Sequence, residues 1–263
     1  MKRAFELQGY IVIPGLLSPD EVKTYRMKLQ RISQLSDEDA QIDAIRGTGW
    51  KDPDGVTHRP DFWPVLFHPQ LVSVLRNVLG PEVRYTQHSD LHVHHGAVGW
   101  HRDCANRTFG VGPDWDEREC RYQVVRVAIY LQAYAESGFA LGVIPGSHRS
   151  EKTITRMELR AWDVLSRFPA VRKRMPPLWF AGKKWIKSEP GDCIIFDQRV
   201  LHTGSRIHGP KYAIFLSYGV ENEHSRRHRR FYLFERPDLH YRDYPAELAE
   251  RLQQSNLYLD WKS

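Results

Sequence analysis

The stretch GDCIIFDQRVLH, residues 191–202, begins with a turn signal at Gly191-Asp192 and continues into an apolar run from Cys193 to Phe196. A short apolar run bounded by Gly and Asp is typical of a buried strand. His202 follows this strand. We therefore expect its side chain at the end of a core element, where it can be held rigidly against a pocket.

Other short strands and several helices are expected on both sides of this stretch. The strands are expected at residues 9–14, 83–86, 91–94, 124–131, around 144 and at 212–218. Helices are expected at 18–32, where Ser18, Pro19 and Glu21 form a capping-box start, and at 67–79, 158–174 and 245–257. This order predicts an all-β core with flanking helices, a double-sheet β-barrel of the jelly-roll, cupin-like kind.

The 263 residues are expected to form one domain, with a basic and helical C-terminal extension from about residue 223. The polar segment 33–60 is expected to be a long loop of the kind that often covers a site. The basic run 226–230 is expected to be solvated surface, which makes a nucleic-acid partner unlikely.

Composition narrows the setting in which this chain works. No apolar stretch approaches the roughly 20 residues that cross a bilayer, so no membrane partner is expected. The three cysteines lack paired spacing, which argues against a disulfide framework and favours a reducing compartment, the cytoplasm. The formal charge of +6 is compatible with an anionic substrate. The sequence leaves the oligomeric state open.

The segment Trp100-His101-Arg102-Asp103 carries a candidate metal-binding pair. In an extended segment, His101 and Asp103 leave the same face and can converge on one point. Together with His202 they offer two imidazoles and one carboxylate, the donor set of non-haem iron(II) oxygenases. Spacing alone also fits polar residues on a solvated strand, and His92 and His94 repeat the same geometry.

Several motifs, in this order, resemble the phytanoyl-CoA dioxygenase family of iron(II)- and 2-oxoglutarate-dependent oxygenases. The resemblance covers about residues 5–222. The motifs are GYIVIPGLL at 9–17 with its Ser-Pro-Asp-Glu helix start, His68-Pro69 before a helix ending in Leu79-Gly80-Pro81, WHRD at 100–103, IPGSH at 144–148, and GDCIIF at 191–196 leading to His202.

The resemblance implies a double-stranded β-helix with His101, Asp103 and His202 as ligands of Fe(II), and with 2-oxoglutarate and O2 as co-substrates. It also implies that 2-oxoglutarate is decarboxylated to succinate while the substrate is oxidised. Halogenating relatives replace the carboxylate ligand with a small residue, so the intact Asp103 favours hydroxylation or a related oxidation.

One departure concerns the co-substrate. Family members usually carry an arginine on the strand after the distal histidine, where it pairs with the far carboxylate of 2-oxoglutarate. Lys211 is expected to replace it, with Arg206 as the rival. Thr203 and Ser217 are further candidates for binding the co-substrate, and Gln87 and His94 are weaker ones for its near carboxylate or for the substrate.

The substrate is expected to be a polar or anionic small molecule, of natural-product, sugar-like or amino-acid-like kind. This expectation rests on polar and aromatic residues in the loop 33–60 and beside the metal motif, among them Trp50, Lys51 and His58. His94, Trp100, Arg102 and Arg107 are the candidate substrate residues, although residues of this kind also occur on exposed loops. The alternative function is a metal-binding jelly-roll protein without oxygenase activity, acting as a binding module.

Overall fold

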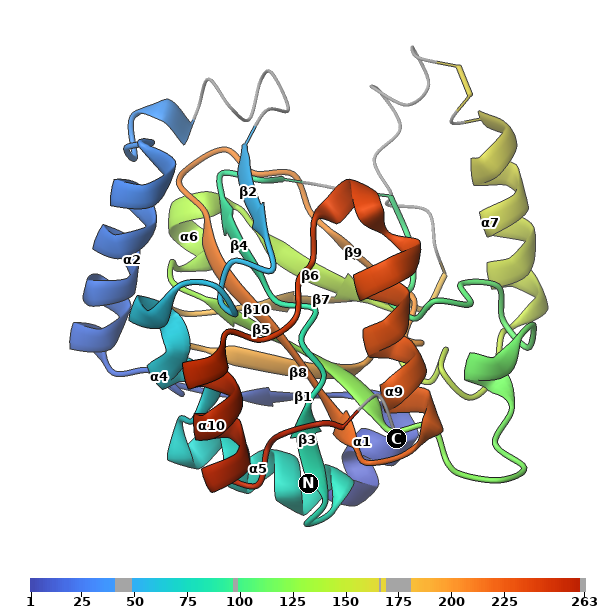
Figure 1. Ribbon diagram of the computed structural model, residues 1–263. Coiled ribbons are helices and arrows are strands. Elements are labelled where there is room, and N and C mark those ends of the chain that lie inside the picture. The colour runs from blue at the N-terminus through green and yellow to red at the C-terminus, as the bar shows by residue number, and fades with distance from the viewer. Residues whose placement is uncertain (41–48, 97–98, 166, 169–180, 261–263) are drawn as a thin grey trace.

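The structure is a computed structural model that describes residues 1–40, 49–96, 99–165, 167–168 and 181–260. Two antiparallel sheets form its core (Figure 1). The larger sheet contains seven strands in the order β1-β8-β5-β10-β4-β2, with β3 also paired to β10. The smaller sheet has the order β7-β6-β9. An all-β core with flanking helices was the prediction, and it is confirmed.

The elements have the following bounds. The strands are β1 Tyr10–Ile13, β2 Trp50–Pro53, β3 Val83–Tyr85, β4 Asp90–Val93, β5 Val124–Tyr130, β6 Ala140–Val143, β7 Lys184–Lys187, β8 Cys193–Asp197, β9 His202–Gly204 and β10 Tyr212–Val220. The main helices are α1 Lys2–Gln8, α2 Pro19–Ser33, α4 Trp63–Leu66, α5 Pro69–Leu79, α6 Tyr134–Ser137, α7 Thr153–Leu165, α9 Glu223–Arg230 and α10 Ala246–Gln254.

The buried strand predicted after Gly191 is β8, and all five of its residues are buried. It pairs with β1 on one side and with β5 on the other, which places it inside the larger sheet. Because side chains alternate along a strand, Ile195 packs into one apolar cluster while Ile194 and Phe196 pack into another.

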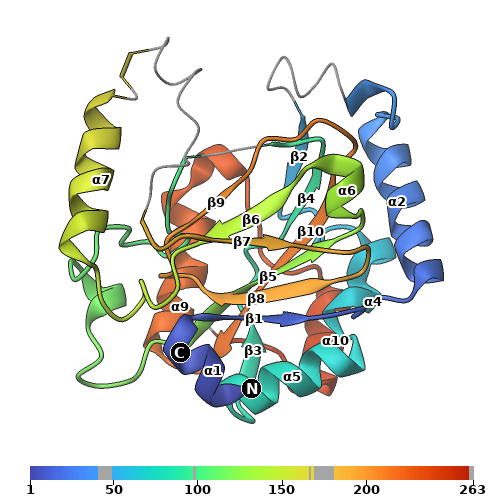
Figure 2. The same ribbon diagram turned by 180° about the vertical axis from the view of Figure 1, so that it is seen from behind.

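The two clusters lie on opposite faces of the large sheet, one on the face covered by helices and the other on the inner face. The first contains Leu29 of α2, Leu75 of α5 and Leu248 of α10. The second contains Leu141 of β6 and Ile186 of β7, so it fills the space between the sheets. In both ribbon views α2 and α7 stand at opposite sides of the sheets, and α1, α5 and α10 lie together at one end (Figure 2).

The predicted helix starts and stops are largely as expected. Ser18 caps α2, and the Glu21 carboxylate accepts a hydrogen bond from the Ser18 backbone N–H at 2.8 Å, as a capping box requires. Gly80 ends α5. The helix expected at 158–174 begins earlier, at Thr153, and its expected C-terminal part falls largely outside the described residues. The expected loop 33–60 contains the edge strand β2, and its residues 41–48 lie outside the description.

The basic run 226–230 belongs to α9. It was predicted to be solvated surface, but only part of it is exposed to solvent. His228 and Arg229 are buried. The Arg229 guanidinium lies 3.6 Å from the ring centroid of Tyr244, pairs with Asp243 at 2.6 Å and donates to the Leu259 carbonyl at 3.0 Å. This arginine therefore fastens the C-terminal segment to the core.

The turn that precedes β8 depends on Gly191, and substitution of this glycine tests that dependence. Its φ is +88°, and a Cβ there would lie 2.4 Å from the Leu17 carbonyl oxygen. Gly182 has a φ of +75° with nothing within 4 Å of such a Cβ. We predict that either change to alanine lowers the free energy of unfolding by about 1 to 2 kcal/mol through the left-handed backbone. Gly191→Ala should cost about 1 to 3 kcal/mol more, because the backbone must move.

Urea denaturation of the two variants and the unchanged protein measures this difference. Equal losses of stability in Gly191→Ala and Gly182→Ala would contradict the packing argument.

Candidate metal centre

Three side chains from two distant segments converge at one end of the space between the sheets. The ligand atoms of His101, Asp103 and His202 all lie within 4.8 Å of one another. The Asp103 carboxylate lies 3.5 Å from His101 Nε2 and 3.6 Å from His202 Nε2. Both imidazoles therefore direct their Nε2 atoms toward the Asp103 carboxylate.

The backbone brings these segments together. His101 and His202 form an antiparallel bridge in which each backbone N–H donates to the other's carbonyl at 3.0 Å. The Asp103 N–H donates to the Gln198 carbonyl at 2.9 Å. The same-face placement expected of an extended segment is therefore produced by one bridge and one further hydrogen bond.

Each imidazole is oriented through its second nitrogen. His101 Nδ1–H donates to the Gly99 carbonyl at 2.8 Å, and His202 Nδ1–H donates to the Val200 carbonyl at 3.0 Å. Because a carbonyl can only accept, the proton sits on Nδ1 and the Nε2 lone pair is left for a metal.

The protonation states suit a divalent cation. Burial alone raises the pKa of Asp103, but His202, His101 and Arg126 offset it and hold that pKa well below its usual value. Burial, and then the neighbouring His101, lower the pKa of His202 to about 4. Near neutral pH, Asp103 is therefore a carboxylate and His202 is uncharged, the forms that bind metal. This donor set fits iron(II).

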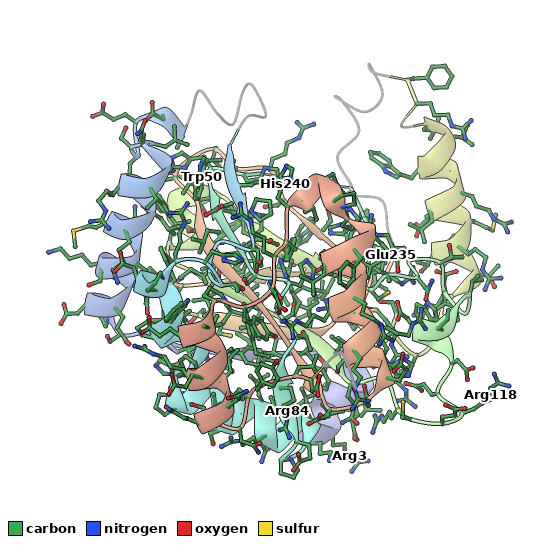
Figure 3. All side chains as sticks on the ribbon, viewed as in Figure 1. Arg3, Trp50, Arg84, Arg118, Glu235 and His240 are labelled. Atoms are coloured by element: carbon green, nitrogen blue, oxygen red, sulfur yellow. The ribbon has the colours of Figure 1, made fainter. Side chains whose placement is uncertain are left out.

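The ligands line a cavity of about 230 Å³ between the two sheets. Its walls are Lys51, Pro53, His88, Asp90, His92, His95, Gly96, Arg126, Tyr130, Phe139, Leu141, Phe196, Gly204, Lys211, Phe215 and Leu239, besides the three ligands. In Figure 3, Trp50 and His240 are labelled at the upper end of the molecule. Their neighbours Lys51 and Leu239 are cavity residues, so β2 and the C-terminal segment both contribute to its wall.

Among the candidate co-substrate residues, Lys211 lines the cavity. Its ammonium donates to the His95 carbonyl at 2.6 Å and lies 4.1 Å from the centroid of the Phe139 ring. Ser217 is buried and is not among the lining residues; its hydroxyl accepts from Gln198 at 2.9 Å and donates to the His88 carbonyl at 3.1 Å.

The remaining three co-substrate candidates do not line this cavity either. Thr203 lies between two cavity residues of β9 and faces the opposite side, beside Gly142 and Trp185. Arg206 is exposed. Gln87 is buried elsewhere, and its amide donates to Asp54 at 2.6 Å.

The four candidate substrate residues also lie away from the cavity. The His94 ring accepts from the Lys211 backbone N–H and donates to the Ser36 carbonyl at 2.8 Å. Trp100 packs against Trp185, with ring centroids 6.4 Å apart. Arg102 is buried in contacts with the carbonyls of Arg199 and Arg107 and with Glu151. Arg107 is exposed.

Sequence reasoning missed the charged pair at the base of the cavity. Arg126 donates to Asp90 in a short contact, and its Nε lies 3.8 Å from the Asp103 carboxylate. A signal was present, because Arg126 is the single charged residue in the otherwise apolar strand VVRVAIY. A charge in a fully buried strand requires a partner. The period of two then places Arg126 and Tyr130 on one face, and His92 and Asp90 on one face of β4.

Comparison with known proteins gives a consistent result. The model of the family described as phytanoyl-CoA dioxygenase (PhyH) matches residues 5–214. An ectoine dioxygenase of Stutzerimonas stutzeri is 28% identical over 160 residues, which is 55% of this chain and 48% of that protein. The matched part thus spans about half of the length of this relative.

Solved structures share the fold. HygX from Streptomyces hygroscopicus, with nickel and 2-oxoglutarate bound, has a TM-score of 0.58 at 16% identity, over 82% of this chain and 84% of that one. EctD from S. alaskensis, with 2-oxoglutarate and 5-hydroxyectoine, has a TM-score of 0.55 at 22% identity, over 84% and 75%. The predicted jelly-roll fold is confirmed by this likeness. None of the helices within the described ranges is long and apolar enough to cross a membrane.

The ligand assignment predicts a selective loss of metal binding. His202→Ala removes one of three ligands and should weaken iron(II) binding at least about 100-fold, beyond the loss typical of an outer-shell partner. His95→Ala is the matched control, because its ring lines the same cavity without joining the three ligands. Calorimetric titration with iron(II) in the absence of oxygen measures both. Unchanged binding by His202→Ala, or an equal loss in both variants, would reject the assignment.

Proposed function

The chain belongs to the phytanoyl-CoA dioxygenase (PhyH) family, and from this membership we propose that it is an iron(II)- and 2-oxoglutarate-dependent dioxygenase that oxidises a small molecule. The observation that carries the proposal is the convergence of His101, Asp103 and His202 on one point of a cavity between two sheets. The fold is that of proteins solved with 2-oxoglutarate bound.

His101, Asp103 and His202 would hold iron(II) at the cavity, where 2-oxoglutarate would also bind it. When bound there, iron(II) and 2-oxoglutarate supply the activation of O2, in which 2-oxoglutarate leaves as succinate and carbon dioxide and the substrate is oxidised. The chain's own part begins with the hydrogen bonds to Gly99 and Val200, which keep both imidazoles aimed.

Arg126 contributes by holding the carboxylate ligand. Its guanidinium is buried between Asp90 and Asp103. Although burial lowers the pKa of Arg126, the two carboxylates more than offset this and raise it, so the side chain stays charged. A fixed positive charge beside Asp103 keeps that group ionised and in place. The rings of Tyr130, Phe139, Phe196 and Phe215 then exclude water from the rest of the wall.

Lys211 is the residue that we assign to the far carboxylate of 2-oxoglutarate. It is 2% exposed, and it has no carboxylate partner within the part of the chain that the structure describes. Burial, and then the charge of Lys51, lower its pKa to about 7. A buried ammonium without an anion favours binding a carboxylate from outside. Arg206, the rival, is exposed and is not among the cavity residues.

The substrate would bind against the cavity residues that metal and co-substrate do not use. We propose that it is a polar or anionic small molecule of natural-product-like, sugar-like or amino-acid-like kind. The intact carboxylate ligand Asp103 favours hydroxylation or a related oxidation over halogenation. The alternative, a metal-binding module without oxygenase activity, would bind metal at the same three residues but would not bind 2-oxoglutarate at Lys211.

The proposed function predicts a spectroscopic signal. Addition of iron(II) and then 2-oxoglutarate in the absence of oxygen should produce the weak visible charge-transfer band of an iron(II)-bound 2-oxo acid. His202→Ala should lose the band because the metal is lost. Metal binding by the unchanged protein without any band on addition of 2-oxoglutarate would favour the binding module instead.

Lys211 also predicts how co-substrate affinity depends on pH. With a pKa of about 7, the side chain is charged below this pH and neutral above it. Only the charged form pairs with the carboxylate. The dissociation constant for 2-oxoglutarate should therefore rise above pH 7, by up to about tenfold per pH unit. Lys211→Arg keeps its charge and should flatten this dependence, whereas Lys211→Ala should bind weakly throughout.

Titration of the iron(II)-saturated proteins with 2-oxoglutarate between pH 6 and 9, followed by the same band, measures these affinities. Arg206→Ala serves as the control and should behave like the unchanged protein. A larger loss in Arg206→Ala than in Lys211→Ala would reverse the assignment.

A further inference from the structure

The charged groups of the cavity can be divided into those that have a partner and those that do not. Asp90 is neutralised by the Arg126 guanidinium and also accepts from the Tyr241 hydroxyl at 2.6 Å. Asp103 is the proposed metal ligand, and Lys211 is proposed to take the far carboxylate of 2-oxoglutarate. Lys51 is the charged cavity residue that none of these pairs uses.

Strand pairing aims Lys51 at the cavity. β2 is the edge strand of the large sheet, and Lys51 lies directly opposite His92 of β4. Residues opposite each other in an antiparallel pair share a face, and His92 is a cavity residue. Lys51 is exposed, so it lies at the mouth. The described residues provide no carboxylate within ion-pair distance of it. Its charge also contributes to the lowered pKa values of Lys211, His92 and His95.

The charge balance of the loaded site leaves this lysine uncompensated. A divalent metal and the dianion of 2-oxoglutarate cancel each other. Among the side chains that line the cavity, Lys51, Arg126 and Lys211 are then opposed by Asp90 and Asp103 alone, because burial keeps His88 and His92 uncharged. One positive charge remains, and the wall described here offers no unpaired carboxylate to a cationic substrate.

A second unused donor lies on the wall at His88. A hydrogen bond of 3.2 Å links Nδ1 of His88 to Nε2 of His228. The Tyr232 ring stacks on the His88 ring, with the ring centroids 3.7 Å apart. His228 Nδ1 is buried and has no partner. If His88 were the donor in this bond, His228 would carry its proton on that buried, unpaired nitrogen, whereas in the opposite arrangement the proton of His88 lies beside the Asp90 carboxylate.

His228 therefore donates to His88, and the proton of His88 sits on Nε2. That nitrogen lies 3.8 Å from the Asp90 carboxylate, which is too long for a hydrogen bond. Because this nitrogen points toward Asp90, and both His88 and Asp90 line the cavity, we infer that its N–H can donate to a molecule bound there.

We propose that the substrate carries an oxyanion, a carboxylate or a phosphate, which pairs with Lys51 at the mouth of the cavity while His88 Nε2–H donates to another oxygen of the same molecule. This inference rests on the proposed function, because metal and co-substrate are taken to occupy the inner part of the cavity. The same charge balance disfavours small molecules whose net charge is positive.

Matched small probes test the preference for an oxyanion. Zinc(II) in place of iron(II), with saturating 2-oxoglutarate, keeps the protein loaded, inactive and suited to NMR. Propionate, ethylphosphonate, propanol and propylammonium are then titrated separately at pH 7.5. We expect either or both anions to bind at least about tenfold more tightly than the alcohol and the ammonium ion, as a charge-assisted contact allows. The stronger anion identifies the group as carboxylate or phosphate.

Substitutions assign the preference to Lys51. Lys51→Ala should abolish it and Lys51→Arg should keep it, and Lys23→Ala on exposed α2 is the control that should change nothing. Anion binding that is equal to propanol binding, or that survives in Lys51→Ala, would overturn the inference. So would a loss of 2-oxoglutarate affinity in Lys51→Ala as large as that in Lys211→Ala, because Lys51 would then belong to the co-substrate site.

The same NMR samples report the tautomer of His88 through nitrogen-15 shifts of its ring. A proton on Nε2 in the unchanged protein, with a mixture of tautomers in His228→Phe, is expected. A proton on Nδ1 in the unchanged protein would overturn the role of His88. Failure of the protein to take up zinc(II) and 2-oxoglutarate would overturn the proposed function as well, whereas normal loading without anion preference would overturn this inference alone.

Discussion

The two backbone hydrogen bonds between His101 and His202 are the constraint on which the rest of the site depends. They join the metal motif to the segment after β8 and set the distance between the two imidazoles before any metal is present. The buried strand β8, held between β1 and β5, makes one side of this bridge rigid. The Asp103 carboxylate lies between the two rings, and the Arg126 guanidinium lies beside it.

The cavity concentrates positive charge, from the buried Arg126 and Lys211 to the exposed Lys51 at its mouth. Arg126 is matched by carboxylates of the chain itself, whereas Lys211 and Lys51 have none among the described residues. An unmatched buried ammonium costs folding stability, and its lowered pKa is the sign of that cost. Ligands that bring their own negative charge relieve it, so binding and electrostatic stabilisation favour the same loaded state.

The C-terminal segment, beyond the family match, supplies part of the cavity wall. The family match ends at residue 214, yet Leu239 lines the cavity, Tyr232 stacks on His88 and donates to the Asp103 carbonyl at 3.3 Å, and Tyr241 binds Asp90. Arg229 anchors the segment through its contacts with Tyr244 and Asp243. The basic run 226–230, expected to be solvated surface, therefore contributes two buried residues, His228 and Arg229, to the core.

Local sequence determined much of this protein. Period-two runs and turn residues were sufficient to predict the strands of the core. Ser18 and Glu21 were sufficient to predict the start of α2, because both features depend on neighbouring residues in the chain. The metal motif was also visible, since two ligands stand two residues apart. The residues that form the wall of the cavity could not be recognised from the sequence. Arg102, Arg107 and Trp100 looked suited to a substrate by position in sequence, but packing turned them away. His88, Asp90, Arg126 and Lys51 face the cavity because strand register and the C-terminal segment place them there, and register is decided by pairing between segments that are distant in sequence.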